Sequence, residues 1–230
     1  MAAAQLWLAR HGQTTWTESG RHTGRTDIPL TSLGEQQAIL LGQRLHAIDF
    51  AEVRASTLQR ARRTAELAGV RATPDERLVE WDYGAYEGRT TIDIQRERPG
   101  WDIWRDGCPD GETADAVAER LAPLKQELAD RTTGLTLLFA HSHVLRVLAS
   151  IWLDLPPQAG RHLVLGTAAL SVLGQEHGWP VIARWNLQPI EGGASPASSE
   201  ADAQLAAERR VAAATIAGEP TAALGGGLSE

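Results

Sequence analysis

The chain has 230 residues, 43% of them hydrophobic and 22% charged, which indicates an ordinary globular protein with one substantial core. Its net charge of −7 argues against nucleic acid or an anionic membrane surface as the main partner, although a local cluster of Arg and His can still attract a phosphate ester. A single cysteine excludes an intrachain disulfide, and the lack of a signal-like or membrane-spanning apolar run predicts a cytoplasmic location.

The first predicted element is a buried strand at Leu6–Ala9, because this short run is apolar at every position. Arg10 and His11 follow it directly, and ligands bind beyond the carboxyl ends of such strands. Gly12 lets the backbone turn or approach a ligand closely. The end of this strand is therefore the first candidate site.

A loop is predicted at Gln13–Leu30, where no long apolar run occurs. It carries small polar residues: Thr14, Thr15, Thr17, Thr23, Gly24 and Thr26. They fit either a solvated loop or a set of hydrogen-bond donors folded over an anion. We favour the second interpretation, because loops of this length in compact domains are usually functional.

Two amphipathic helices are predicted next. Ser32 and Glu35 fit a capping box, and apolar residues then recur at helical spacing: Ala38, Leu41, Leu45 and Ile48. A weak strand at Val53–Ala55 leads to the second helix, which Ser56 or Thr57 is expected to cap. That helix has an apolar face of Leu58, Ala61, Ala65 and Ala68, and Gly69 ends it. Its first two turns carry Arg60, Arg62 and Arg63.

The segment Pro74–Gly111 is irregular, and we interpret it as an insertion that forms one wall of a cleft, with its tryptophans packed rather than exposed to substrate. A further helix has Val117, Leu121, Leu124 and Leu128 inward. Pro123 within it predicts a kink or a broken start.

A second buried strand is predicted at Leu135–Ala140, again ending in a histidine, His141. A nearly all-apolar helix follows at Val144–Leu153. Two late strands are expected at Ala168–Leu173 and Val181–Trp185. The alternation predicts an α/β fold, a three-layer α/β/α sandwich with a mostly parallel central sheet and a small inserted cap.

This domain is expected to span residues 1–190, with residues 81–111 as the inserted cleft wall. From about residue 191 the composition shifts to Ala, Gly, Ser and Glu, which predicts a disordered tail over 191–230.

If both histidine-terminated strands are parallel members of one sheet, Arg10, His11 and His141 meet at its edge, and Arg60 joins them from a helix start. Two Arg and two His around one point form an anion site that suits phosphoryl transfer. A histidine there can take the phosphoryl group covalently. Glu80, between apolar and aromatic residues, is a candidate proton donor to the leaving oxygen.

A metal site is the alternative, because His141, Ser142 and His143 follow a strand and His11 lies near. Alternating strand positions point to opposite faces, which weakens this reading. The arginine cluster would also repel a cation.

Segments across the chain resemble the motifs of the histidine phosphatase superfamily, the phosphoglycerate-mutase-like fold. They are Leu8–Trp16, Ser56–Ala65, Glu80–Gly88, Gly111–Thr113 and Phe139–His141, and they occur in the family's order. The resemblance implies that His11 is the phosphorylated nucleophile, and that Glu80 is the proton donor and then the base for water. It also implies phosphoryl binding by Arg10, Arg60 and His141.

Further substrate contacts are expected at Thr17, Thr23, Gly24, Ser142 and Arg146. Two of these depart from the family's pattern. Ser142 stands where glycine is usual, a change that is mild if only its N–H is used but straining if φ is positive. Thr17 stands where the mutases carry asparagine.

The segments His22–Asp27, Glu80–Gly88 and Trp101–Cys108 look most like the sedoheptulose-1,7-bisphosphatase branch and resemble actinobacterial acid phosphatases. This implies hydrolysis of a small phosphorylated metabolite, such as a sugar phosphate or bisphosphate, with no cofactor and no metal. Candidates for a second phosphate are Arg25, Arg89, Arg105 and Arg146. A broad-specificity acid phosphatase, a cofactor-dependent phosphoglycerate mutase and a non-catalytic phosphosugar sensor remain alternatives, and a homodimer is left open.

Overall fold

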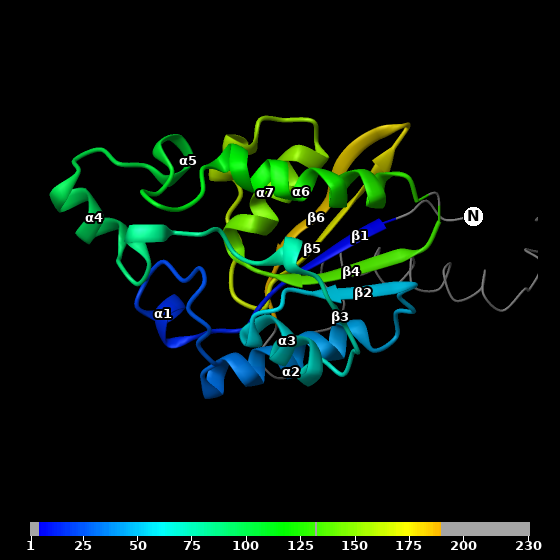
Figure 1. Ribbon diagram of the computed structural model, residues 1–230. Helices are drawn as coiled ribbons and strands as arrows, with labels where there is room; N and C mark the ends of the chain where they lie inside the picture. Colours follow the sequence, from blue (N-terminus) through cyan, green and yellow to red (C-terminus); the bar gives the residue numbers. More distant parts are fainter. Residues whose placement is uncertain (1–4, 132, 190–230) are drawn as a thin grey trace, which may run out of the picture. The chain divides into compact units, whose positions relative to one another are not determined.

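The computed structural model describes residues 5–131 and 133–189. Within them a six-stranded sheet has the order β3-β2-β4-β1-β5-β6 (Figure 1). The strands are β1 (Gln5–Arg10), β2 (Glu52–Ala55), β3 (Thr73–Pro74), β4 (Leu135–Ala140), β5 (Leu170–Glu176) and β6 (Trp179–Leu187). The four strands β1, β2, β3 and β4 run parallel to one another. β5 and β6 are added at one edge in antiparallel pairs. The predicted α/β class with a mostly parallel sheet is confirmed.

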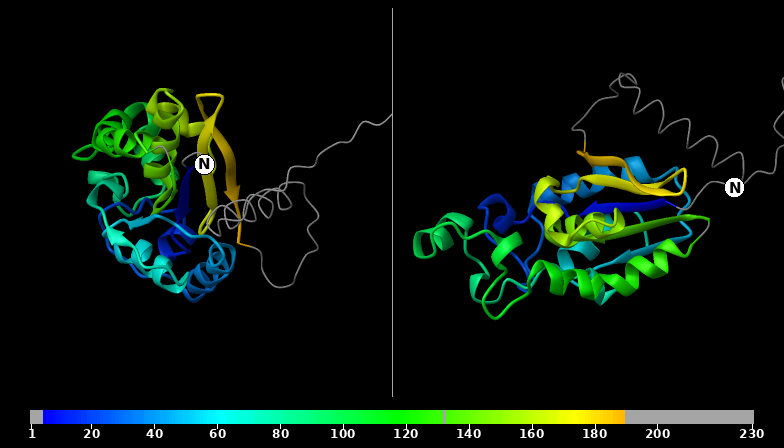
Figure 2. Two further views of the ribbon diagram at one scale, coloured as in Figure 1. Left: turned by 90° about the vertical axis from the view of Figure 1, so that its right-hand side faces the viewer. Right: turned by 90° about the horizontal axis from the view of Figure 1, so that it is seen from above.

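Helices cover both faces of this sheet (Figures 1 and 2). The α-helices are α1 (Thr15–Glu18), α2 (Ser32–Leu45), α3 (Gln59–Leu67), α4 (Thr91–Glu97), α5 (Ile103–Asp106), α6 (Ala114–Ala129) and α7 (Ser142–Trp152). Short 3-10 turns are η1 (Glu76–Leu78), η2 (Gly84–Tyr86) and η3 (Pro157–His162). The pair α2 and α3 packs on one face, and α6 and α7 pack on the other, which makes the three layers.

The core explains why β1 is apolar throughout. Leu6 and Leu8 join the buried cluster that α6 and α7 complete, and the intervening Trp7 lies on the other face, with its ring 5.6 Å from that of Phe50. Both faces of the strand are therefore removed from water. Such burial agrees with the position of β1 between β4 and β5, in the centre of the sheet.

The segment after η1 lies at the end of the sheet where β1 and β4 finish, together with α1, α4 and α5 (Figure 1). Its tryptophans Trp81, Trp101 and Trp104 are buried, as predicted. Two of the indole N–H groups find backbone acceptors: that of Trp81 donates to Glu112 O and that of Trp101 to Gly107 O, both at 2.9 Å. The role of residues 81–111 as a cleft wall stays a prediction.

Both predicted helix caps are wrong. The cap of α2 is Thr31, one residue before Ser32, and its hydroxyl accepts from Gly34 N over 3.0 Å. The cap residue of α3 is Leu58, which has no side-chain bond to the helix. A distant carboxylate, that of Asp27, instead accepts from Gln59 N over 2.8 Å. A partner so far away in sequence leaves no local pattern.

Three other expectations change. The predicted loop Gln13–Leu30 contains α1, held by reciprocal bonds between Thr14 and Thr17 and too short to show a periodic pattern. Ile48 lies beyond the end of α2. Pro123 does not start α6, which begins at Ala114 behind a Thr113 cap and runs through the proline.

The remaining expectations agree closely with the structure or lie outside it. The predicted bounds of β4 match residue for residue, and β5 and β6 lie at the two predicted late strands. The predicted tail over 191–230 lies outside the described residues.

Candidate active site

Two histidines meet at the carboxyl ends of β1 and β4. The strands pair in parallel with Arg10 opposite Ala140, and the backbone N–H of His11 donates to Ala140 O over 3.0 Å. The buried imidazole rings of His11 and His141 lie 5.1 Å apart, centroid to centroid. The parallel pairing that the sequence argument needed is present.

His11 carries its proton on Nδ1. That nitrogen lies 2.7 Å from Gly12 O, and a carbonyl oxygen can only accept a hydrogen bond. Nε2 therefore keeps a free lone pair. Burial, and then the charges of Arg60 and Arg10, hold the pKa of His11 well below its usual range. The side chain is thus a neutral imidazole with an available nucleophilic nitrogen.

Gly12 allows a close approach of the backbone to α2. A Cβ at this position would lie 2.3 Å from Gly34 O in α2. Its N–H donates to Thr64 Oγ1 over 3.0 Å, and that hydroxyl donates to Arg60 O over 2.7 Å. The residue next to the candidate nucleophile is therefore fixed to both α2 and α3.

Arg60, near the start of α3, is fully buried. Its Nε–H donates to His141 Nδ1 over 3.1 Å. Its other bonds go to the backbone oxygens of Thr26 (3.0 Å), Thr23 (3.1 Å) and Gly24 (2.9 Å). These contacts use four of the five guanidinium N–H groups, which leaves one for a ligand.

Arg10 also keeps an unused donor. Its Nη1 donates to Leu165 O over 2.6 Å, whereas its Nε is buried and has no partner among the described residues. Burial lowers the pKa of Arg10 from its ordinary value, but a guanidinium stays charged in proteins. A buried N–H without an acceptor is costly, and an oxyanion in the site would satisfy it.

Glu80 is buried beside the N-terminus of α7. Its carboxylate accepts three backbone N–H groups, those of Trp81 (2.9 Å), His143 (3.1 Å) and Val144 (2.9 Å). These bonds fix the carboxylate at the start of α7, the helix that follows His141. The sequence does not show this arrangement, because no local pattern indicates that α7 begins beside Glu80.

Thr23 and Gly24 lie in a loop that Glu87 organises. The Glu87 carboxylate accepts from Gly24 N and from Thr26 N, each over 3.0 Å. A Cβ at Gly24 would lie 2.6 Å from Trp81 O, so only glycine fits there. Sequence reasoning gave Glu87 no role of its own, although it belongs to the segment that resembles the family's acid motif.

Of two expected substrate contacts, Thr17 has its hydroxyl proton already bonded, whereas Ser142 keeps an available N–H. The Thr17 hydroxyl donates to Thr14 O over 2.9 Å and accepts from Thr14 N over 2.8 Å, so its donor is already used. Ser142 is the first residue of α7 with ordinary helical backbone, so serine in place of glycine causes no strain here. Its N–H remains available as a helix N-terminal donor.

Arg146 lies one turn further along α7. Its Nε donates to Gly160 O over 2.9 Å, and its guanidinium lies 4.6 Å from the centre of the Trp104 ring. Burial lowers its pKa to about 10. The other three candidates for a second phosphate each have a carboxylate partner, in the pairs Arg25–Asp82, Arg89–Glu97 and Arg105–Asp106. Among the described residues no carboxylate pairs with Arg146.

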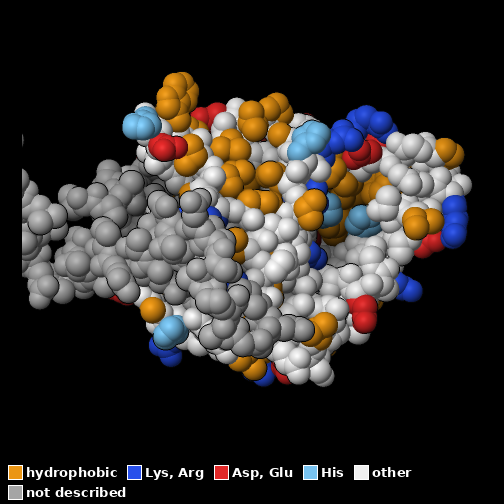
Figure 3. All heavy atoms as spheres, turned by 180° about the vertical axis from the view of Figure 1, so that it is seen from behind, with side chains coloured by type: hydrophobic (Ala, Val, Ile, Leu, Met, Phe, Trp, Pro, Cys, Tyr) orange, Lys and Arg blue, Asp and Glu red, His pale blue; other side chains and the backbone are white. Residues whose placement is uncertain are grey.

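An aromatic recess lies beside Glu80, and Figure 3 shows histidine and hydrophobic side chains gathered in a hollow of this face. The ring of His22 lies 4.7 Å from that of Tyr83 and 5.7 Å from that of Trp101. The Tyr83 hydroxyl lies 2.7 Å from His143 Nδ1. These rings give the candidate site an apolar wall.

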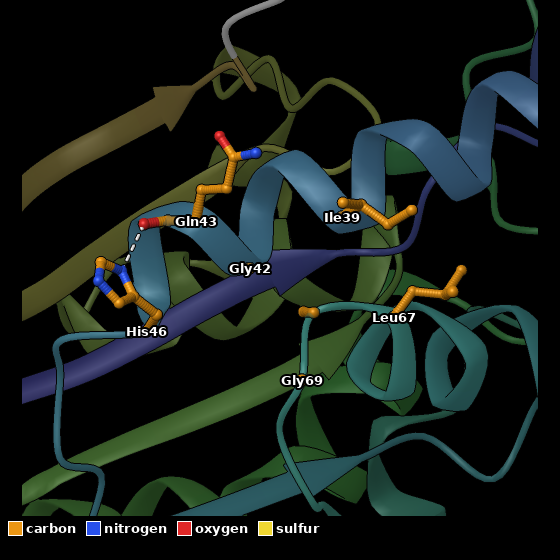
Figure 4. Close-up of a pocket in the computed structure, with 7 residues that line it drawn as sticks. Ile39, Gly42, Gln43, His46, Leu67 and Gly69 are labelled. Carbon is orange, nitrogen blue, oxygen red and sulfur yellow. Dashed lines mark hydrogen bonds between the residues drawn. The ribbon is translucent and has the colours of Figure 1, made fainter. Parts of the chain in front are cut away.

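A separate groove of about 380 Å³ lies between the C-terminal parts of α2 and α3 (Figure 4). It is lined by Ile39, Gly42, Gln43, His46, Leu67, Ala68 and Gly69. No arginine or lysine is among these residues, so the groove does not suit a phosphate group.

The metal alternative finds no support in this geometry. Over residues 5–131 and 133–189, no three His, Cys, Asp or Glu side chains converge in a way that could hold a metal ion. His143 instead directs Nδ1 to Tyr83. No helix within these ranges is long and apolar enough to cross a membrane.

Residues 6–188 match the profile of the histidine phosphatase superfamily (branch 1). An acid phosphatase of Mycobacterium tuberculosis is 37% identical over 197 residues, which cover 82% of this chain and 97% of that protein. Sedoheptulose 1,7-bisphosphatase of Saccharomyces cerevisiae is 37% identical over 186 residues, 66% of this chain and 68% of that protein. The solved structure of an open reading frame from Mycobacterium tuberculosis has a TM-score of 0.78 at 36% identity, covering 81% of this chain and 99% of that one.

Proposed function

The chain belongs to the histidine phosphatase superfamily, and from this membership we propose that it hydrolyses small phosphate monoesters through a phosphohistidine at His11. The observation that carries the proposal is the bond from His11 Nδ1 to Gly12 O, because it leaves Nε2 unprotonated in a pocket of arginines. In the first step Nε2 attacks phosphorus and the bond from phosphorus to the alcohol oxygen breaks. In the second step water attacks phosphorus and the N–P bond breaks.

The charge that develops on the phosphoryl oxygens meets donors fixed before the substrate arrives. The cationic donors that support this role are the remaining N–H of Arg60 and the Nε–H of Arg10, which has no partner in the part of the chain that the structure describes. His141 has both ring nitrogens engaged, Nδ1 by Arg60 and Nε2 by Ser56, so its proposed part is to hold these two groups in place beside the phosphoryl site. Preorganised donors of this kind stabilise a transition state without reorganising during the reaction.

We assign the proton transfers to Glu80. As a carboxylic acid it donates to the leaving alcohol oxygen, and as a carboxylate it then takes a proton from the attacking water. Its position supports this assignment, since it is buried at the start of α7, the helix that follows His141.

The proposed substrate class is a sugar phosphate or sugar bisphosphate, such as sedoheptulose 1,7-bisphosphate. Arg146 supports a second anionic group, because it lies one helical turn from Ser142 and lacks a carboxylate partner among the described residues. The printed name of the yeast relative agrees with this class. Thr17, Thr23, Gly24 and Ser142 stay predicted substrate contacts, and a homodimer and a cytoplasmic location stay predictions.

The test is phosphate release, in the presence of a strong chelator, from sedoheptulose 1,7-bisphosphate and p-nitrophenyl phosphate side by side. A large kcat/KM preference for the bisphosphate supports the sugar-bisphosphatase assignment. Weak and similar rates on both esters favour a broad acid phosphatase. Transfer of phosphate within a phosphoglycerate favours the mutase, and tight binding without turnover favours a phosphosugar sensor.

A further inference from the structure

Ser56 lies at the end of a third parallel strand, beside the two histidines. It follows β2 directly, and its N–H donates to Phe139 O of β4 over 2.9 Å. Its side chain is fully buried, and Oγ lies 2.8 Å from His141 Nε2. The ends of β1, β4 and β2 thus present His11, His141 and Ser56 in adjacent positions.

The direction of the bond between Ser56 and His141 follows from Arg60. The Nε–H of Arg60 donates to His141 Nδ1 over 3.1 Å, so Nδ1 has no proton of its own. A neutral imidazole must then carry its proton on Nε2. Ser56 Oγ is therefore the acceptor of the bond and His141 is the donor.

The Ser56 hydroxyl consequently has its lone pairs occupied and its proton free. Oγ accepts from His141 Nε2 and, over 3.3 Å, from Leu58 N. Among the described residues no acceptor faces the hydroxyl proton. A buried hydroxyl normally finds an acceptor, and the pocket between Arg10, Arg60 and the two histidines would hold an anion.

We propose that Ser56 is a further phosphoryl-binding residue, whose hydroxyl donates a hydrogen bond to an oxygen of the group transferred to His11. This inference rests on the proposed function for its catalytic meaning, but the contact itself concerns any phosphate oxyanion in the pocket. The two N–H groups that donate to Oγ polarise the hydroxyl and make it a stronger donor. The contact is a hydrogen bond from a neutral hydroxyl, so it adds no further positive charge to the site.

The competing explanation is that Ser56 only positions His141. In that case its hydroxyl matters through the imidazole and has no effect once the imidazole is removed. A direct contact with phosphate remains when His141 is absent. The two explanations therefore differ in a double-mutant cycle.

The experiment measures the binding of inorganic phosphate by calorimetry to the full-length wild type, Ser56→Ala, His141→Ala and the double variant. Ser56→Ala is expected to weaken binding roughly 10- to 100-fold, the range for a hydrogen bond to a charged group, and to do so in both backgrounds. Ser150→Ala is the matched control, because Ser150 is equally buried but its hydroxyl donates to Arg146 O of its own helix. Thermal unfolding of each variant verifies that it folds.

Unchanged phosphate affinity in Ser56→Ala would overturn the proposal, as would a loss that disappears in the His141→Ala background. Failure of the wild type to bind phosphate would overturn it too. Hydrolysis of p-nitrophenyl phosphate is measured on the same wild-type sample. If the wild type binds phosphate and hydrolyses no ester, the proposed function fails while the binding result for Ser56 still stands.

Discussion

Arg60 donates its Nε–H to Nδ1 of His141 over 3.1 Å, so two groups that are both cationic when protonated share one hydrogen bond. The bond exists only if His141 is neutral. Burial, and then the charge of Arg60, hold the pKa of His141 well below its usual range. His11 is held neutral in the same way but with the opposite tautomer.

The first prediction is therefore that both imidazoles stay neutral as the pH falls through the ordinary histidine range near 6.5. Nitrogen-detected NMR of the free enzyme should show Nδ1–H on His11 and Nε2–H on His141 at pH 6 and at pH 7 alike. Observation of an imidazolium at either position at pH 6 would contradict the tautomers on which the nucleophile assignment depends.

The second prediction concerns Glu80→Gln. The amide cannot donate a proton to a leaving alcohol, so kcat/KM for a sugar phosphate should fall by about 10²- to 10⁴-fold. The loss on p-nitrophenyl phosphate should be much smaller, because p-nitrophenolate leaves with little need of a proton. Steady-state rates on both esters provide the measurement, and thermal unfolding shows whether the three N–H contacts are still satisfied. Equal losses on both esters would rule out the general-acid role.

The third prediction concerns Arg146→Met, which keeps an unbranched stem against Trp104 and removes the charge. KM for a sugar bisphosphate should rise roughly 10- to 100-fold, while KM for p-nitrophenyl phosphate should stay the same. Arg105→Met is the control, because Arg105 is exposed and paired with Asp106. A parallel rise of KM for both esters would show that Arg146 supports the fold and not a second phosphate.

The fourth prediction concerns stability at low pH. Burial lowers the pKa of His22 to about 4, below its value in the unfolded chain. Between pH 6.5 and 4 the unfolded state therefore binds more protons than the folded state. The contribution of neutral His22 to the free energy of unfolding is complete above pH 6.5 and is lost as the pH falls toward 4. The slope reaches at most about 1.4 kcal/mol per pH unit for one group. His22→Phe keeps an aromatic ring against Tyr83 and does not titrate.

Urea unfolding at pH 7 and pH 4.5 measures this contribution. The free energy of unfolding should fall less between these two pH values in His22→Phe than in the wild type. The variant's own value at pH 7 serves as its baseline, so a packing change does not enter the comparison. An equal fall in both proteins would show that His22 does not contribute to the acid sensitivity.

The sheet and the central pair of histidines could be predicted because they depend on local patterns. Leu6–Ala9 and Leu135–Ala140 are apolar at nearly every position, and each leads directly into polar residues of the site. Two parallel strands with this pattern must bring His11 and His141 to one edge. The resemblance then selected Arg60 among three neighbouring arginines, and the structure buries Arg60 beside His141.

Contacts between distant segments could not be predicted. Asp27 caps α3, and Glu80 lies at the N-terminus of α7, although neither is near its partner in sequence. Ser56 was expected to cap a helix, because serine before an amphipathic run usually does so. In the structure its hydroxyl instead bonds to His141, which directly follows the neighbouring strand β4, a partner that only the sheet order brings close.

The most direct test of the account is to trap the phosphoenzyme. Wild type and His11→Ala are mixed with p-nitrophenyl phosphate, quenched within one turnover in alkali, which preserves phosphohistidine, and examined by intact-mass and peptide mass spectrometry. The account predicts one phosphoryl group on His11 in the wild type, and neither a phosphoryl group nor appreciable turnover in His11→Ala. A phosphoryl group on another residue, or substantial turnover in His11→Ala, would contradict it.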